Sequence, residues 1–319
     1  MLGMNELKER IKITETTVEC PVKGCSEKVE RQRDVFKREE RFKCPKHNIY
    51  ISPSTFEYQS EAENLLWTGA DDKDLLDKIK MVKRECRMAR DNSEDAVTWN
   101  VFRFLERNNL VEITLSSIVD FAQSSEVIYW SYSQEENSSW SELNKAREEF
   151  GEEIKRSSEP DVIIKTDNTL LFIEAKLTAG NETTPSNTSN SKKYETGGNN
   201  WFSKVFKSNY KTVAITEKKY ELMRFWLLGT WMAKQQDLDF YLVNLVLSER
   251  EKDIEAIFRR HIYENQRKKF IRISWEDIHH QILSTDLSGM DKGTMVKYFR
   301  NKTIGYDGNG KLQKAFSIQ

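Results

Sequence analysis

Two acids and a lysine stand at the ends of two apolar runs in the stretch EPDVIIKTDNTLLFIEAKL, residues 159–177. Asp161 opens the first run, and Glu174 and Lys176 close the second. The turn-forming pair Asp167-Asn168 between the runs predicts a hairpin of two strands. Because side chains alternate between the two faces of a strand, Glu174 and Lys176 emerge on the same face. The tight turn allows Asp161 to lie near Glu174.

Two carboxylates held this close repel each other and are costly to bury unless a cation lies between them. Oxygen ligands of this kind suit Mg²⁺ or Mn²⁺. The neighbouring Lys176 can then hold and help to activate a water, or neutralise charge on a transferring phosphoryl group. A third acid, Glu94, lies on the apolar face of a predicted helix, where a charge is unexpected unless the helix end meets the metal site. It could bind the ion directly or through water.

Taken together, these residues resemble the PD-(D/E)xK nuclease superfamily, which has the restriction-endonuclease-like fold. The likeness rests on an acid-bearing helix, the pair Pro160-Asp161 and the triplet Glu174-Ala175-Lys176, and it spans about residues 91–285. The resemblance implies Mg²⁺-dependent phosphodiester hydrolysis, usually of DNA. Asp161 and Glu174 would be its metal ligands, together with the backbone carbonyl of Ala175. Lys176 would be its catalytic lysine.

The helical acid of the same family falls on Glu94, although a longer stretch than usual separates it from Asp161. Three rival acids for this role are Glu152, Glu153 and Glu159.

The first part of the chain carries two further pairs of candidate ligands. Cys20 and Cys25 form one pair, and Cys44 and His47 form the other. Their spacing suits a tetrahedral Cys₃His zinc site, although unrelated reduced thiols are the alternative. A segment this short has little core, so a structural Zn²⁺ would supply its folding energy. The segment resembles a zinc ribbon in broad terms.

Basic residues interleaved with aromatic ones follow the strand of Lys176. Such a stretch can clamp phosphates and stack bases, or it can be a solvated surface whose aromatics pack on the core. The candidate nucleic-acid contacts are Lys192, Lys193, Lys204, Lys207 and Lys211.

The order of predicted elements indicates an α/β fold with a mixed central sheet flanked by helices. We expect a zinc-ribbon-like module at 1–60, a helical connector at 61–90, a nuclease-like domain at 91–285 and an unassigned tail at 286–319. Within the nuclease-like domain we expect helices near 92–109, 114–123, 138–152, 218–234, 250–265 and 276–283, strands at 126–133, 160–166, 169–177, 240–247 and 270–275, and a long loop at 178–200.

Charge and hydropathy exclude some classes of protein. Charged residues make up 32% of the chain, but 50 Lys and Arg nearly cancel 51 Asp and Glu, so any site for a polyanion is a local patch. The sequence shows neither a leader segment nor an apolar run long enough to span a membrane, so we expect a cytoplasmic protein.

The sequence thus predicts a Mg²⁺- or Mn²⁺-dependent DNA endonuclease that acts on double-stranded DNA in restriction or antiphage defence. A homodimer or a partner protein is plausible, because double-strand cleavage needs two active sites. The alternative is a non-catalytic nucleic-acid-binding or interaction protein on a nuclease-like scaffold.

Overall fold

The computed structural model describes residues 1–33, 35–83, 85–116, 125–154, 157, 159–187, 191–287 and 289–318. The chain forms two compact units, each built from separate segments. Unit 1 contains Met1–Gly69, Arg87–Asn108 and Trp275–Gln319, and unit 2 contains Ala70–Cys86 and Asn109–Ser274. The chain therefore passes between the two units several times.

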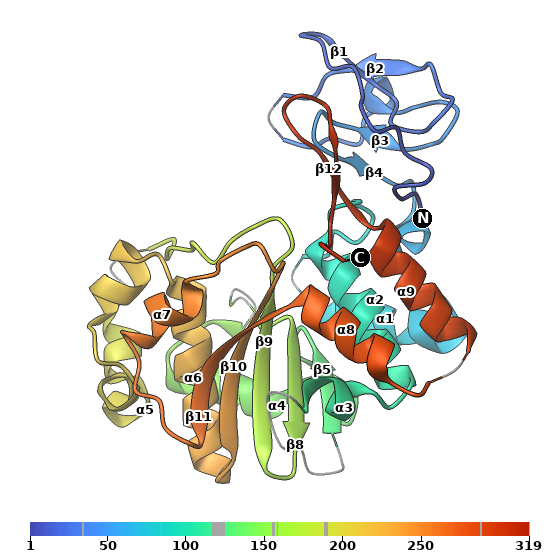
Figure 1. The fold of residues 1–319 in the computed structure, drawn as a ribbon. Helices are drawn as coiled ribbons and strands as arrows, with labels where there is room; N and C mark the ends of the chain where they lie inside the picture. Colours follow the sequence, from blue (N-terminus) through green and yellow to red (C-terminus); the bar gives the residue numbers. More distant parts are fainter. Residues whose placement is uncertain are drawn as a thin grey trace. The chain divides into compact units, whose positions relative to one another are not determined.

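Unit 2 is built around a seven-stranded sheet with the order β11-β10-β9-β8-β5-β6-β7. The strands β9, β10 and β11 run parallel, and the remaining neighbours pair antiparallel. The predicted mixed sheet is therefore confirmed (Figure 1). The strands are β5 (Ser125–Tyr129), β6 (Tyr132–Ser133), β7 (Ser138–Ser139), β8 (Val162–Thr166), β9 (Thr169–Ala175), β10 (Asp239–Val246) and β11 (Lys268–Ser274).

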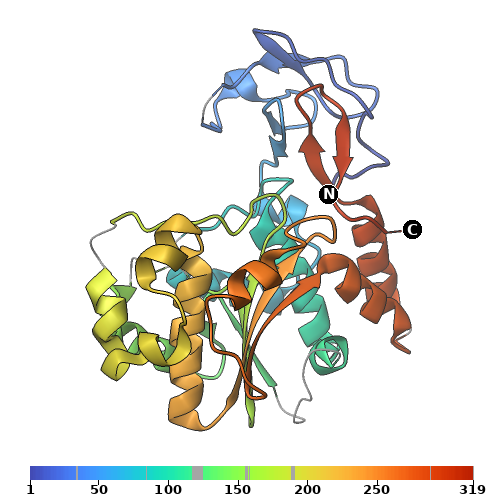
Figure 2. The ribbon, with the colours of Figure 1, turned by 60° about the vertical axis from the view of Figure 1, so that its left-hand side comes forward.

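Helices flank this sheet, and α6 is central among them because it packs against β9 and β10 (Figures 1 and 2). Helix α6 is apolar around most of its circumference, as expected of a buried helix. Its Gly229 leaves room for the ring of Phe240, which a Cβ would meet at 2.0 Å. The helices of unit 2 are α1 (Ala70–Val82), α3 (Val111–Leu115), α4 (Ser141–Glu149), α5 (Ser191–Val205), the π-helix η5 (Lys211–Thr216), α6 (Tyr220–Gln236) and α7 (Ile254–Arg259).

Three expectations about unit 2 need correction. The single strand expected at 126–133 is a hairpin of β5 and β6, because Trp130 and Ser131 take positive φ angles of 44° and 72°. The loop expected at 178–200 already becomes helical at Ser191, where Tyr194 is buried and stacks on Tyr210, whereas residues 197–200 have non-helical φ and ψ angles and interrupt α5. The helix expected at 250–265 is only α7. The helix expected at 114–123 falls largely on 117–124, outside the described residues.

Unit 1 combines a small β-rich module with helices. The predicted helix near 92–109 is confirmed as α2, and the hydroxyl of Ser93 caps it by accepting from the N–H of Ala96 at 3.1 Å. The elements are β1 (Thr17–Glu19), β2 (Lys28–Glu30), η1 (Glu40–Phe42), β3 (Tyr50–Ile51), β4 (Phe56–Glu57), η2 (Glu61–Asn64), α2 (Glu94–Arg107), α8 (Trp275–Ser284), α9 (Met290–Asn301), β12 (Thr303–Tyr306) and β13 (Leu312–Lys314).

The tail left unassigned at 286–319 therefore contains α9 and the hairpin of β12 and β13. Tyr306 and Leu312 of this hairpin share a hydrophobic core with Leu7, Val18 and Ile51 of the N-terminal module. The module thus gains apolar contacts from the far end of the chain.

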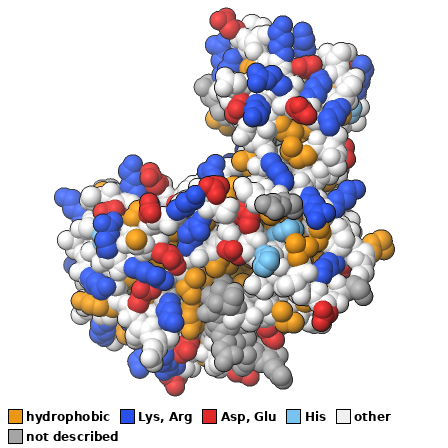
Figure 3. All heavy atoms as spheres, in the orientation of Figure 1, with side chains coloured by type: hydrophobic (Ala, Val, Ile, Leu, Met, Phe, Trp, Pro, Cys, Tyr) orange, Lys and Arg blue, Asp and Glu red, His pale blue; other side chains and the backbone are white. Residues whose placement is uncertain are grey.

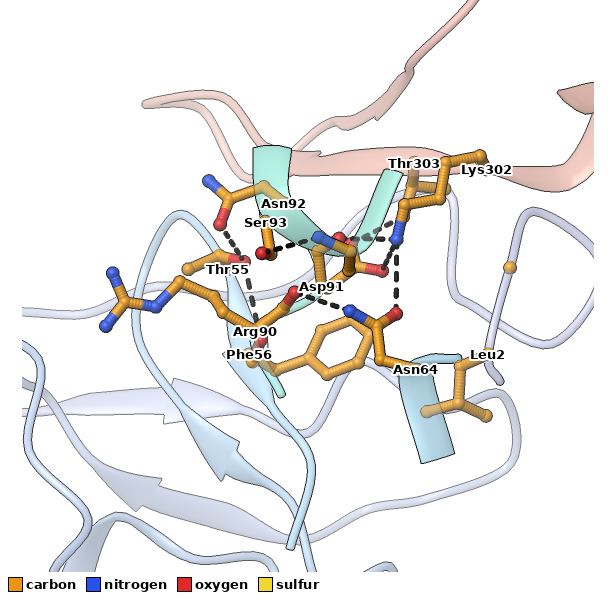
Figure 4. A network of polar contacts seen from close by, with 12 residues as sticks. Leu2, Thr55, Phe56, Asn64, Arg90, Asp91, Asn92, Ser93, Lys302 and Thr303 are labelled. Atoms are coloured by element: carbon orange, nitrogen blue, oxygen red, sulfur yellow. Dashed lines mark hydrogen bonds and ion pairs between the residues drawn. The ribbon is translucent and has the colours of Figure 1, made fainter. Parts of the chain in front are cut away.

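A buried polar network joins the C-terminal part of unit 1, at Lys302 and Thr303, to Asn64 and Asp91 (Figure 4). The ammonium of Lys302 lies 3.2 Å from a carboxylate oxygen of Asp91, and both side chains are fully buried. It also donates to the Asn64 amide oxygen at 3.3 Å, and Thr303 donates to the other Asp91 oxygen at 2.7 Å. A buried charge that is paired and hydrogen-bonded in this way is tolerated in a protein interior.

Candidate active site and metal centre

The hairpin of β8 and β9 places Asp161 opposite Glu174. Val162 pairs with Ile173, so continuing the antiparallel register by one residue brings Asp161 against Glu174. Both lie on the face of the sheet whose Ile163 and Phe172 belong to the core with α6. The Asp161 carboxylate accepts from the Ala175 N–H at 2.8 Å and from the Trp130 indole N–H at 3.0 Å. These two bonds fix the carboxylate at the end of β9.

Glu174 is buried, with 3% of its surface exposed. One carboxylate oxygen lies 2.5 Å from the ammonium of Lys176, whereas the other is buried and has no hydrogen-bond partner among the described residues. Burial raises the pKa of Glu174 well above its ordinary value. Lys176 opposes this rise, and the neighbouring charges of Asp161 and Glu221 add to it. A buried carboxyl in this state is stabilised by any cation that reaches its open oxygen.

A further acid, Glu221, lies in the first turn of α6, 3.9 Å from the ammonium of Lys176. The sequence does not distinguish it, because an acid in the first turn of a helix is common for its interaction with the helix dipole. The structure thus gathers Asp161, Glu174, Lys176 and Glu221 at one end of the sheet.

This group fits a hard divalent cation. Carboxylate and carbonyl oxygens are the ligands of Mg²⁺ and Mn²⁺, and the open buried oxygen of Glu174 has no hydrogen-bond partner among the described residues. Within the described ranges, no Asp, Glu, His or Cys side chain joins Asp161 and Glu174 in a preformed group of three. Such a cation would therefore be held by two carboxylates, with backbone oxygens and water completing its shell, as is usual for Mg²⁺.

The acids considered for the helical position have separate settings. Glu94 is the first residue of α2 and belongs to unit 1, so its role stays a prediction. Glu152 is fully engaged elsewhere, because its carboxylate takes two hydrogen bonds from the guanidinium of Arg224, one of them at 2.7 Å. Glu153 is exposed and Glu159 is half-buried.

The predicted zinc ligands converge in unit 1. The ligand atoms of Cys20, Cys25, Cys44 and His47 all lie within 4.8 Å of one another. The Nδ1 atom of His47 is 3.6 Å from the Cys20 sulfur and 3.5 Å from the Cys44 sulfur, and the Cys25 and Cys44 sulfurs are 3.9 Å apart. Four ligands at about 2.3 Å from a tetrahedral centre lie about 3.8 Å apart. The arrangement can hold a zinc ion.

Tight turns bring these ligands together. Gly24 takes a φ of +75° just before Cys25, and Asn48, with a φ of 53°, donates its N–H to the carbonyl of Cys44 at 2.9 Å. Burial raises the pKa of the Cys20 thiol, and a bound metal ion would stabilise its thiolate there. Cys86 lies outside the cluster and is half-buried.

The candidate nucleic-acid contacts lie on α5, on η5 and between them. Lys192, Lys204, Lys207 and Lys211 are exposed, and Lys193 is half-buried. The nearby aromatics mostly serve the core, since Tyr194, Phe202, Phe206 and Tyr210 are all buried. Figure 3 shows basic and acidic side chains interspersed within each unit on the face in view. These lysines stay candidates for phosphate contacts, and the buried rings beside them are not placed to stack on bases.

The mixed α/β sheet carries the acid-lysine group at one end of its strands. Residues 23–302 match the family model described as "Restriction Endonuclease associating with ARP", and because this is most of the chain, the protein belongs to that family. Neither the curated proteins nor the solved structures contain a match to the chain. No helix in the described parts of the chain is both long and apolar enough to cross a membrane.

Proposed function

We propose that this protein is a divalent-cation-dependent nuclease that hydrolyses phosphodiester bonds of double-stranded DNA. The observation that carries the proposal is the buried Glu174, whose second oxygen has no partner among the described residues and whose pKa is raised in part by the nearby charge of Asp161. A buried glutamate beside a half-buried aspartate destabilises a fold unless the pair serves a ligand. The family description, which names a restriction endonuclease, gives independent support.

Each side chain of the group has a proposed role. Asp161, Glu174 and the carbonyl of Ala175 would hold Mg²⁺ or Mn²⁺, which supplies Lewis-acid stabilisation of phosphoryl charge. The Lys176 ammonium, now bonded to Glu174, donates hydrogen bonds to the attacking water or to a phosphoryl oxygen. Glu221, which lies 3.9 Å from this ammonium, would help to hold it at the end of the sheet. Glu94 stays a further catalytic candidate.

The remaining parts have supporting roles. A structural Zn²⁺ on Cys20, Cys25, Cys44 and His47 stabilises the N-terminal module. The lysines on α5 and η5 contact the phosphate backbone, which makes binding weaken as salt concentration rises. The family description also names an association with ARP, so we expect the chain to act with such a partner, in restriction or antiphage defence. Double-strand cleavage would engage two copies of the site.

Incubation with nucleic acid tests the proposal. Zinc-loaded protein is incubated with linear duplex DNA, single-stranded DNA and RNA, with Mg²⁺, with Mn²⁺ and with chelator. We expect metal-dependent cleavage of duplex DNA that Asp161→Ala abolishes without loss of folding. If the protein binds these substrates but cleaves none of them with Mg²⁺ or with Mn²⁺, a non-catalytic nucleic-acid-binding protein would be favoured instead.

A further inference from the structure

A second polar cluster lies beside the acid pair, where β9 and β10 end. Asn244 interrupts the apolar strand FYLVNLVL and is the register partner of Glu174 on the parallel neighbour. Asn244 is fully buried, and Asn181, from the segment that follows β9, is 1% exposed. The side-chain nitrogen of Asn181 donates to the side-chain oxygen of Asn244 at 2.7 Å. Asn244, the register partner of Glu174, therefore connects Asn181 to the acid pair.

Glu251 fixes the orientation of the Asn181 amide. Its carboxylate accepts from the backbone N–H of Asn181 at 2.8 Å and from the side-chain nitrogen at 2.5 Å. An ionised carboxylate only accepts hydrogen bonds, so the amide oxygen of Asn181 has to point away from it. The side-chain nitrogen of Asn181 donates one hydrogen to Glu251 and the other to Asn244. These two bonds fix the plane of the Asn181 amide and so the direction of its oxygen.

The turn that carries Glu251 is itself held in place. Glu251 takes a φ of 47°, which is uncommon for a residue with a side chain and persists only where the surroundings enforce it. The guanidinium of Arg272 donates to the carbonyls of Ser248 and Arg250, each at 2.7 Å. Arg250 in turn donates to the carbonyl of Thr178 at 2.6 Å, which ties the turn to the segment after β9.

The oxygen oriented in this way has no hydrogen-bond partner among the described residues, although it is buried. Leaving such an acceptor unsatisfied costs about 1–3 kcal/mol. The two hydrogen bonds from Asn181 to Glu251 already anchor the segment that follows β9. Anchoring alone therefore does not explain why an unsatisfied amide oxygen is kept there. The second carboxylate oxygen of Glu174 is likewise buried and has no hydrogen-bond partner among the described residues. Amide oxygens bind hard cations and accept hydrogen bonds from the waters that Mg²⁺ retains.

We propose that Asn181 supplies a further oxygen to the divalent-cation site of Asp161 and Glu174, and that Glu251 and Asn244 are positioning residues that orient it. This inference rests on the proposed function, because it assumes that Asp161 and Glu174 bind such a cation. Outer groups of this kind usually change metal affinity by about 10- to 100-fold when they are removed.

Titration of the zinc-loaded full chain with Mn²⁺ tests the inference without any cleavage assay. We expect one Mn²⁺ site that Asp161→Ala removes, and Asn181→Ala should weaken it by about 10-fold or more. Glu251→Gln should weaken it as well, because a glutamine amide can donate to the Asn181 oxygen and turn it away from the cation. The matched control is Glu249→Gln, because Glu249 forms an exposed ion pair with Lys252. The Mn²⁺ affinity of this variant should equal that of the wild type. Zinc content and thermal midpoint are measured for each variant.

The outcomes separate two failures. A Mn²⁺ site that depends on Asp161 but has the same affinity in Asn181→Ala and in Glu251→Gln would overturn this inference alone. If Asn181→Ala does not fold, Glu251→Gln decides in the same way. Absence of any Mn²⁺ site that depends on Asp161 would overturn the inference and the proposed function together.

Discussion

Two buried glutamates show how surroundings decide what a residue does. The carboxylate of Glu152 takes two hydrogen bonds from Arg224. Burial alone would raise the pKa of Glu152, but the guanidinium holds it below its ordinary value. The pKa of Glu174 is raised by burial and by the charges of Asp161 and Glu221, and the neighbouring Lys176 does not reverse the rise. Such opposite shifts separate a structural ion pair from a candidate functional carboxyl.

The Glu152–Arg224 pair yields a prediction about stability. Arg224→Met leaves the buried Glu152 carboxylate without its cationic partner, so the free energy of unfolding should fall by about 3–5 kcal/mol at neutral pH. The folded-state pKa of Glu152 is lowered, so the stabilisation by Arg224 is present above the ordinary value of 4.5 and is lost as pH falls through the lowered value. The difference between variant and wild type should therefore narrow in acid.

Urea unfolding at several pH values measures this difference. Lys252→Met, which removes an exposed ion pair with Glu249, is the control and should leave stability unchanged. Equal stability of Arg224→Met and wild type at neutral pH would contradict the structural role given to the pair.

At the scale of elements, local patterns predicted the parts that depend on local contacts. The turn at Asp167-Asn168 and the two-residue alternation suffice to bring Asp161 near Glu174, and β8 and β9 form that hairpin. The helical start at Ser191 could not be predicted in this way, because it depends on the packing of Tyr194 against Tyr210, from outside the segment. Glu221 and Asn181 were missed for the same reason: their partners come from distant parts of the chain.

The zinc ligands yield a prediction about the metal content and folding of the N-terminal module. Cys20→Ser removes one of four ligands, so we expect zinc to fall from one ion per chain to none and the N-terminal module to unfold. Cys86→Ser is the matched control, because Cys86 lies outside the cluster, and it should keep the full zinc content. Elemental analysis together with hydrogen exchange of residues 15–58 measures both. A wild-type protein without zinc would contradict the prediction.

The packing of α6 on the sheet depends on a missing side chain. A Cβ at Gly229 would meet the Phe240 ring at 2.0 Å, so Gly229→Ala should lower the free energy of unfolding by about 1–3 kcal/mol through overpacking. Gly293 in α9 has no atom within 4 Å of a Cβ, so Gly293→Ala should stabilise by about 0.4–1 kcal/mol. Thermal unfolding of both variants measures the contrast. A stabilising Gly229→Ala would show that α6 does not pack as described.

At the scale of the whole molecule, the chain builds its units from distant segments. Unit 1 closes through the buried pair of Asp91 and Lys302, which joins η2, the start of α2 and the start of β12 (Figure 4). The sequence does not predict this pair, because neither residue belongs to a recognisable pattern and 211 positions separate them. The pair explains how a tail that looked polar becomes part of the N-terminal core.

Breaking this pair should therefore affect unit 1 selectively. Lys302→Met leaves Asp91 buried without its cation, at a cost of about 3–5 kcal/mol. We expect faster amide hydrogen exchange in β3, β4, β12 and β13, and unchanged exchange in β9 and β10. Lys311→Met, an exposed residue outside the network, serves as the control. Equal protection of β12 in Lys302→Met and wild type would contradict this account of how the unit closes.

The central claim is that Asp161, Glu174 and Lys176 form a cation-dependent site for phosphodiester hydrolysis. The most direct measurement is the rate of supercoiled-plasmid cleavage in Mg²⁺ by wild type and by Lys176→Met, at equal zinc content and equal thermal midpoint. We expect cleavage by the wild type and a rate at least about 100-fold lower in the variant, the loss typical of a removed charge-stabilising group. Equal cleavage rates in folded wild type and Lys176→Met would contradict the account.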